Sequence, residues 1–393
     1  MSHHQQELSE WIEIVSRKLP HLYAAEVKVL ALYSFGAVLS QSCGISKISG
    51  LLSMLLGQDP NTVRQRLREL TYASKDKRGE KRRSLQVEHS FGDLLRWVLS
   101  WWASSEQRLA LAIDATSFRN IFTVLTISVV YRGCAIPVAW KVLKSEQKGE
   151  WQAHWEGLID YLSPAVPADW FVLVLADRGL YAKWLYEKCV AVKWHPFLRI
   201  NQQGQFRPQH NRCFRLLSKL VHAQRPDWSG RVTCFKTQDC QLDCTLLAHY
   251  DPTYNDPWLV VTDLTPKQAD IAWYGMRSWI EAGFKDLKRG GWGWHHTKMK
   301  DPARAERLWL VLTVATLWTL SVGSYLETHL PASSFAPLPD TWTTSKKAHR
   351  RLSCFTLGQL AILAAFIRHL PVFVCEFVYE QWPRSSWNLQ LLS

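Results

Sequence analysis

The chain has 393 residues, of which 47% are hydrophobic. It is therefore long enough for roughly two or three structural units and too apolar to be disordered throughout. Lys and Arg outnumber Asp and Glu by 47 to 34, which gives a formal net charge of +13. This excess favours a polyanionic partner such as DNA, RNA or an anionic membrane, and a basic protein without such a partner fits the charge equally well.

The nine cysteines are odd in number and scattered along the chain. Residues 1–10 are polar, so we expect no secretory signal and a reducing cytoplasm with free thiols. Cys234, Cys240 and Cys244 lie close together in the sequence, but no Cys-x-x-Cys pair occurs. We expect buried strand cysteines here, and a structural zinc site is the alternative.

Residues 1 to about 70 have the patterns of helices. Lys47–Leu56 is a short apolar-periodic helix, residues 57–60 form a turn, and residues 61–70 form a second helix. The arginines of the second helix are Arg64, Arg66 and Arg68. This pair resembles a helix-turn-helix, whose second helix enters the major groove of DNA. An ordinary helical hairpin with a solvated basic face is the alternative.

The basic segment 75–83 contains no apolar residue. We expect it to separate two domains and to lie along DNA phosphates, where it adds affinity without reading sequence. A plain flexible connector is the alternative.

Strand patterns begin at residue 109. Trp170–Ala176 is a continuous apolar run, typical of a strand covered on both faces. Arg132-Gly133 predicts a hairpin turn between two β-rich runs. The expected strands are 109–114, 122–131, 135–142, 170–176 and 194–200, with helices at 150–162 and 181–189.

Residues 202–265 read as a β-rich insertion with strands at 231–236, 242–250 and 258–263. A long helix then runs from Pro266 to Arg289 and stops at Gly290-Gly291, and the rest of the chain is mainly helical. Leu308–Leu326 approaches transmembrane length, but Thr, Ser and Gly dilute it. We expect a helix buried in a large core; a membrane protein is the alternative.

Two acidic residues close apolar strands: Asp114 follows residues 109–113, and Asp177 follows residues 170–176. If the two strands are neighbours in one sheet, their carboxylates converge, which is costly unless cations compensate the charge. Mg²⁺ suits such a site because it prefers oxygen ligands. Either aspartate alone is more commonly a turn former or a helix cap.

The helix predicted over 266–289 has a polar stripe. At about 100° per residue, one side carries Tyr274, Arg277, Glu281, Lys285 and Lys288. The opposite side is apolar and carries Met276, Trp279, Ile280, Phe284 and Leu287. A lone acid among bases fits a phosphate-binding surface with one metal ligand in it. A solvated face of an amphipathic helix is the alternative.

The spacing Tyr274-x2-Arg277-x3-Glu281-x6-Lys288 matches the Y-R-E-K motif of DDE transposases from bacterial insertion sequences, in the insertion-sequence-four group. The resemblance covers roughly residues 105 to 325. It implies an α/β fold: a ribonuclease-H-like mixed sheet with flanking helices, interrupted by a β-rich insertion, with helical N- and C-terminal regions. It also implies that Asp114, Asp177 and Glu281 are the catalytic, metal-binding acids.

The mechanism implied by the resemblance uses two Mg²⁺ ions, for which Mn²⁺ substitutes. Water frees a 3′-hydroxyl at the element end, and that hydroxyl attacks target DNA. Tyr274, Arg277, Lys285 and Lys288 would bind DNA. The partners implied are double-stranded DNA, as terminal inverted repeats and target, and a second copy in a homodimer. Trp258 would be a platform for a flipped base, although core packing is its commoner role.

This interpretation divides the chain into a helical DNA-binding region with the basic linker (1–85), a catalytic domain in two parts (86–201 and 266–328), the insertion (202–265) and a helical, dimerising C-terminal region (329–393). The expected location is the cytoplasm, on the nucleoid. The rival interpretations are another nuclease on the same fold and a DNA-binding regulator derived from a transposase.

Overall fold

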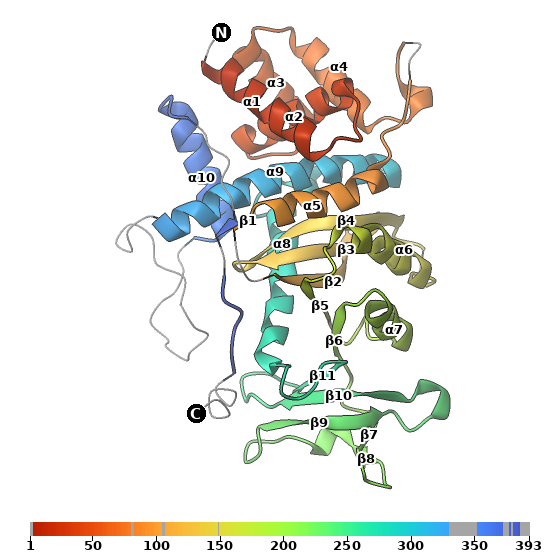
Figure 1. Cartoon of the computed structure of the whole chain (residues 1–393). Helices are drawn as coiled ribbons and strands as arrows, with labels where there is room; N and C mark the ends of the chain where they lie inside the picture. The colour runs from red at the N-terminus through yellow and green to blue at the C-terminus, as the bar shows by residue number, and fades with distance from the viewer. Residues whose placement is uncertain are drawn as a thin grey trace.

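The computed structural model describes residues 3–79, 82–103, 107–147, 149–329, 352–371, 377–378 and 380–385. Four N-terminal helices lie at one end of the molecule, a long helix passes beneath them, and a large sheet extends away from that helix (Figure 1). Residues 80 and 81 of the predicted basic linker lie outside the described residues, as do residues 330–351 and 386–393 of the predicted C-terminal region.

The N-terminal region is helical, as predicted. Its helices are α1 (His3–Lys18), α2 (Ala24–Ser40), α3 (Ile45–Leu56) and α4 (Pro60–Thr71). Residues in the α3–α4 turn suit the ends of both helices. Gly57 ends α3 with φ 62°, a conformation that favours glycine. Asp59 caps α4, because its side chain accepts a hydrogen bond from the Thr62 N–H at 2.9 Å. The two helices of the expected helix-turn-helix are therefore present.

A three-stranded antiparallel meander forms one end of the sheet. Its strands are β2 (Arg108–Phe118), β3 (Phe122–Tyr131) and β4 (Cys134–Lys144). The predicted hairpin between β3 and β4 is confirmed, because Arg132 and Gly133 have φ values of 47° and 71°. Two consecutive residues with positive φ match the twist of a two-residue hairpin.

Two parallel strands follow β2 across the sheet. Strand β5 (Phe171–Ala176) pairs in parallel with β2, and β6 (His195–Arg199) pairs in parallel with β5. The connections pass through α6 (Gln152–Leu162) and α7 (Lys183–Ala191). The continuous apolar run in β5 is explained by burial, since Val172 to Ala176 are all inaccessible to solvent.

The strand-rich segment 202–265 continues this same sheet. Its strands are β7 (Gln205–Pro208), β8 (Arg215–Leu216), β9 (Asp227–Cys234), β10 (Leu242–His249) and β11 (Trp258–Thr262). Strand β11 pairs antiparallel with β6, so the ten strands run in the order β4-β3-β2-β5-β6-β11-β10-β9-β7-β8. Seven of the nine neighbouring pairs are antiparallel.

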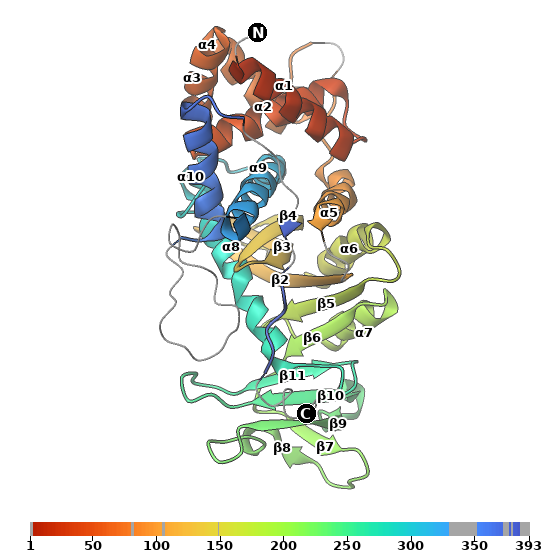
Figure 2. The same ribbon diagram turned by 60° about the vertical axis from the view of Figure 1, so that its left-hand side comes forward.

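Helices cover both faces of the meander. Figure 2 shows α8 (Trp279–Leu287) on one side of the sheet, and α5 (Phe91–Ser100), α6 and α7 on the other. The remaining short elements are η1 (Ser74–Asp76), η2 (Val87–Ser90), η3 (Ser163–Ala165), η4 (Leu217–Lys219), η5 (Gln238–Cys240), η6 (Ile271–Ser278) and η7 (Trp294–His296).

Helix α9 (Pro302–His329) joins the N-terminal helices to the sheet, and it contacts both α2 and β4. Within the described residues, α9 is the one single helix long and apolar enough to cross a membrane, but 94% of its most apolar window is buried inside the protein. Arg307 on α9 donates hydrogen bonds to the carbonyl oxygens of Thr71 and Leu85, both at 3.0 Å. These contacts are those of a core helix, as expected.

The prediction of one long α-helix over 266–289 is wrong about where the helix starts and about its type. Asp270 caps the segment by accepting the Ala272 N–H, so the helix begins at Ile271. Its first eight residues wind as the 3₁₀-helix η6, and only Trp279–Leu287 is α-helical. A 3₁₀-helix has about three residues per turn, so side chains from this part point elsewhere than an α-helical projection places them.

The C-terminal helix α10 (Cys354–Ile367) packs closely on α9, and a two-residue strand β12 (Phe377–Val378) pairs with β1 (Trp102–Ala103). The close approach depends on two glycines. A Cβ atom on Gly323 would overlap the Cys354 carbonyl, and one on Gly358 would overlap the Thr319 carbonyl. The α9–α10 contact is therefore made between backbones.

We expect Gly358→Ala to lower the free energy of unfolding by about 1–3 kcal/mol, because the added methyl group forces the two backbones apart. Urea denaturation of the full chain measures this. The matched control is Gly50→Ala within α3, where nothing lies within 4 Å of the added Cβ. That change should raise stability by about 0.5–1 kcal/mol. Equal stability of Gly358→Ala and the wild type would refute the close α9–α10 contact.

Candidate active site

The two aspartates predicted to converge do lie side by side. The parallel pairing of β2 with β5 ends at Ile113 opposite Ala176, so Asp114 and Asp177 are the next residues on the two neighbouring strands. The prediction that Asp114 closes its strand is wrong. Strand β2 continues to Phe118 because β3 goes on pairing with it beyond the end of β5.

One oxygen of each aspartate is held by the backbone. Oδ1 of Asp114 accepts a hydrogen bond from the Ala115 N–H at 2.8 Å. Oδ1 of Asp177 accepts one from the Gly179 N–H, also at 2.8 Å. The two Oδ2 atoms are therefore the ones left for other partners.

Arg277, from η6, brings the three acids together. Its Nη2 lies 2.8 Å from Oδ2 of Asp114 and 3.2 Å from Oδ2 of Asp177, so these oxygens are no more than about 6 Å apart. Its Nη1 lies 2.5 Å from Oε1 of Glu281, on α8. The structure thus gathers all three predicted acids around one guanidinium group.

The cluster carries more negative than positive charge. Burial raises the pKa of Asp114; Arg277 and the Ala115 N–H oppose the shift, and Asp177 and Glu281 add to it. The Arg277 side chain is 12% exposed and that of Asp114 is 17% exposed, whereas Glu281 is 63% exposed. One guanidinium therefore faces three carboxylates, of which Asp114 is the most buried and Glu281 the most exposed.

The donor set fits a hard divalent cation. Carboxylate oxygens are the ligands that Mg²⁺ and Mn²⁺ prefer, and the excess negative charge is what such ions compensate. Within the part of the chain that the structure describes, no three acidic, histidine or cysteine side chains are arranged to share one ion. At the acid cluster, Arg277 lies between them.

Residues 105–318, which hold all three acids and the strands that position them, match the family described as Transposase DDE domain. The chain belongs to this family. No curated protein matches it. The matched transposase domain spans more than half of the chain, from the start of β2 into α9, and leaves the N-terminal helices and α10 outside.

The residues of the predicted polar stripe do not share one exposed face. Tyr274 is buried and packs edge-on against Trp258, with ring centroids 5.2 Å apart. Burial raises the pKa of Tyr274 to about 12. The stripe prediction is wrong for this residue, because it assumed α-helical winding where the chain forms the 3₁₀-helix η6.

The two lysines of the predicted stripe differ. Nζ of Lys288 donates to Oγ1 of Thr116 at 2.6 Å and to the Ser117 carbonyl at 2.8 Å, so this ammonium group sits at the end of β2, beyond Asp114. Burial lowers its pKa. Lys285 is exposed on α8.

Sequence reasoning missed a basic surface beyond the end of β2. It is formed by the β2–β3 turn and the segment 288–300, which are joined where Arg119 donates to the His295 carbonyl at 2.8 Å. The exposed basic residues of this surface are Arg119, Arg289, His296, Lys298 and Lys300. The signal in the sequence was the density of bases at 288–300, which follows no helical or strand period and therefore predicts no element.

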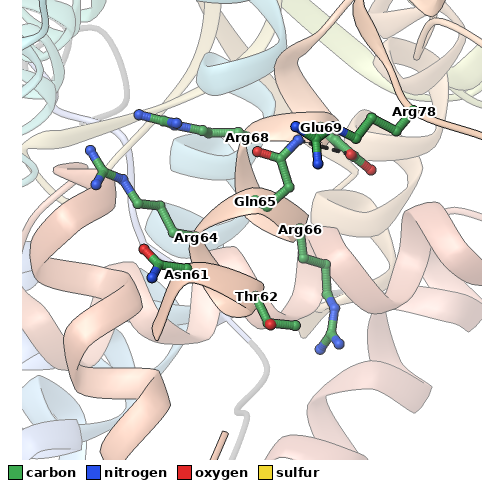
Figure 3. Close-up of a pocket in the computed structure, with 8 residues that line it drawn as sticks. All are labelled: Asn61, Thr62, Arg64, Gln65, Arg66, Arg68, Glu69 and Arg78. Atoms are coloured by element: carbon green, nitrogen blue, oxygen red, sulfur yellow. Dashed lines mark hydrogen bonds between the residues drawn. The ribbon is translucent and has the colours of Figure 1, made fainter. Parts of the chain in front are cut away.

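The predicted recognition helix has the expected two faces. Val63, Leu67 and Leu70 are buried. The other face borders an open depression of about 570 Å³, lined by Asn61, Thr62, Arg64, Gln65, Arg66, Arg68 and Glu69 and by Arg78 from the linker. Figure 3 shows Arg64 and Arg68 extending to one side of α4 and Arg66 to the other.

The cysteine cluster does not converge on a metal site. Cys234 and Cys244 are buried on the neighbouring strands β9 and β10, with sulfur atoms 3.8 Å apart. Cys240 is exposed in the turn between them. Two of the three are thus buried strand residues, as expected.

We expect Asp114→Asn to raise the melting temperature near neutral pH in metal-free buffer. A carboxyl group whose pKa is raised by folding destabilises the native state above its ordinary pKa, because the unfolded chain ionises more readily. The advantage of the amide should be full above the folded pKa. It should shrink as the pH falls through the raised pKa towards the ordinary value.

Thermal melts across this pH range test the prediction. The matched control is Asp169→Asn, an exposed residue that precedes β5 at its other end, and it should leave the melting temperature unchanged. If Asp114→Asn melts below the wild type at neutral pH, the cluster is not overcharged.

Proposed function

We propose that this protein is a DNA transposase of the insertion-sequence-four group, which cleaves DNA at the ends of a mobile element and joins those ends to target DNA. The convergence of Asp114, Asp177 and Glu281 on one point of a transposase domain carries the proposal. The Y-R-E-K spacing from Tyr274 to Lys288 supports the assignment to the group.

We further propose that the core is ribonuclease-H-like. Three antiparallel strands followed by two parallel ones, in the order β4-β3-β2-β5-β6, support this topology. In this interpretation residues 86–201 and 266–328 form the catalytic domain, and residues 202–265 are an insertion that widens the sheet beyond β6.

The three acids would hold Mg²⁺ or Mn²⁺, the aspartates through the Oδ2 atoms that face Arg277. Bound divalent ions supply positive charge to the attacking and leaving oxygens at phosphorus. The backbone N–H groups of Ala115 and Gly179 orient the aspartates before any ligand arrives, because each fixes one carboxylate oxygen. Reorganisation during the reaction is reduced as a result.

Two basic side chains at the acids would bind DNA phosphates. Arg277 presents a planar guanidinium suited to two parallel hydrogen bonds with phosphate oxygens. Lys288, held at the end of β2 by Thr116, acts as a point charge. Lys285, one turn of α8 earlier, extends the same contact. Tyr274 acts by packing: its buried ring against Trp258 positions the η6 segment that carries Arg277.

Two further surfaces would hold the duplex. Helix α4 presents Arg64, Arg66 and Arg68 with Asn61 and Gln65. These are side-chain types that commonly contact phosphates and base edges in a major groove. The segment 288–300 contacts the end of β2 through Lys288 and reaches this helical region through Trp292. The Cys43 N–H donates to the Trp292 carbonyl at 2.6 Å and ties the two together. We propose that a homodimer forms on DNA through the C-terminal region.

We expect Asp114→Asn, Asp177→Asn and Glu281→Gln each to abolish Mg²⁺-dependent cleavage of DNA that carries the element ends, while each variant still binds that DNA. Gel assays of cleavage and of binding measure the two effects separately. Asp169→Asn, far from the cluster, is the control and should cleave normally. Full cleavage by one variant would remove that residue from the catalytic set.

A strand-transfer assay with a pre-cut element end distinguishes a transposase from a nuclease with the same fold. Incubated with target DNA and Mg²⁺, a transposase joins the free 3′ end to the target, whereas a nuclease only hydrolyses. Absence of any joined product would contradict the proposed function.

The basic surface should add affinity that depends on salt and not on sequence. Removing a side chain that neutralises one phosphate reduces the steepness of log affinity against log salt by about 0.9. The double variant Lys298→Ala/Lys300→Ala should therefore flatten the slope by almost two, for any duplex. Lys28→Ala, an exposed charge on α2, is the control. An unchanged slope in the double variant would mean that these lysines face only solvent.

A further inference from the structure

Arg277 contacts the Oδ2 atoms of both aspartates, the oxygens that no backbone N–H holds. Oδ1 of Asp114 and Oδ1 of Asp177 are each taken by a backbone N–H, and both Oδ2 atoms contact Nη2 of the guanidinium. A cation that binds both aspartates through these Oδ2 atoms uses the oxygens that the guanidinium already contacts. The guanidinium and a metal ion therefore compete for one set of oxygens.

The withdrawal of Arg277 and the entry of a divalent ion are each unfavourable when they happen alone. If Arg277 withdraws alone, three carboxylates lose their counter-charge, and breaking a buried ion pair on one side is strongly unfavourable. If a divalent ion enters while Arg277 stays, two like charges meet at close range in a poorly solvated place. Exchange becomes favourable only when an anion receives the guanidinium as the ion enters.

The guanidinium has one N–H group, at Nε, that could donate a hydrogen bond to such an anion. Arginine carries five N–H donors. Nε of Arg277 is buried and has no hydrogen-bond partner within the described chain. Lys288 lies at the same edge of the sheet, at the end of β2, so an anion there meets a second positive charge. A DNA phosphate, with several acceptor oxygens, matches this pair.

We propose that Arg277 is an exchangeable counter-ion: the three carboxylates hold it before divalent ions bind, and a DNA phosphate takes it over when they do. Metal binding and DNA binding then strengthen each other. The metal ion replaces the positive charge that Arg277 takes away from the acids, and the phosphate supplies the negative charge that receives Arg277. By linkage the two effects are equal in size, typically about 5- to 150-fold for coupled sites. The proposal rests on the proposed function, since it assumes that the acids bind metal.

Binding of Mn²⁺ to the full chain tests the exchange, followed by electron paramagnetic resonance or calorimetry with and without a short DNA duplex of arbitrary sequence. For the wild type we expect the duplex to tighten Mn²⁺ binding about tenfold, within the usual range for coupled sites. Arg277→Gln should bind Mn²⁺ without DNA about as tightly as the wild type does with it. In that variant the duplex should change Mn²⁺ affinity less than about twofold, since the coupling is abolished.

Two further variants make the result specific. Lys28→Gln removes an exposed charge from α2 and should keep the wild-type coupling. Arg277→Lys keeps a positive charge but, as a point charge, cannot span both aspartates and Glu281, so Mn²⁺ binding without DNA should tighten by less than in Arg277→Gln. If circular dichroism shows that Arg277→Gln does not fold, Arg277→Lys takes its place as the test variant.

The outcomes separate the two levels of the proposal. If Arg277→Gln binds Mn²⁺ no better than the wild type, or keeps the wild-type coupling, the exchange is refuted while the metal site stands. If Mn²⁺ binds to neither chain, or if Asp114→Asn does not weaken it, the acids are not the metal site and the proposed function fails with it. Lower thermal stability of metal-free Arg277→Gln, restored by Mn²⁺, would support the exchange independently of activity.

Discussion

The repulsion among three carboxylates at the end of two parallel strands is the constraint on which the rest of the site depends. Asp114 and Asp177 follow the last β2–β5 pair, and Asp114 is fixed in place because β2 remains paired with β3 beyond that point. Glu281 meets them through Arg277. A fold that tolerates such crowding gives up stability at this point, as functional sites commonly do.

The helices around the sheet hold this arrangement in position. Helix α8 lies close to the meander because Gly283 has no side chain where Ala135 of β4 approaches; an added Cβ would meet that alanine at 2.7 Å. After the last residue of α8, Lys288 donates a hydrogen bond to Thr116 near the end of β2. The acid from α8 and the two from the strands thus belong to one packed scaffold, which would limit reorganisation during the proposed reaction.

The same scaffold links the acids to the surfaces proposed to bind DNA. Arg307 on α9 anchors both ends of the linker between the N-terminal helices and the sheet. The segment 288–300 runs from α8 towards α9 and contacts the α2–α3 turn through Trp292. A duplex held by α4 and by this segment would therefore be presented to the acids in a fixed orientation, an arrangement suited to cleavage at a set distance from a recognised sequence.

Local patterns in the sequence determined several elements: the apolar run of β5, the Arg132-Gly133 turn and the helix pair before residue 71. These follow from periodicity and turn chemistry, which act over a few residues. Only the tertiary structure decided that Asp114 lies within a strand, that segment 202–265 continues the central sheet, and that Arg277 stands among the acids. Each depends on pairing partners far away in the chain, and so does the burial of Tyr274 in a 3₁₀-helix against Trp258.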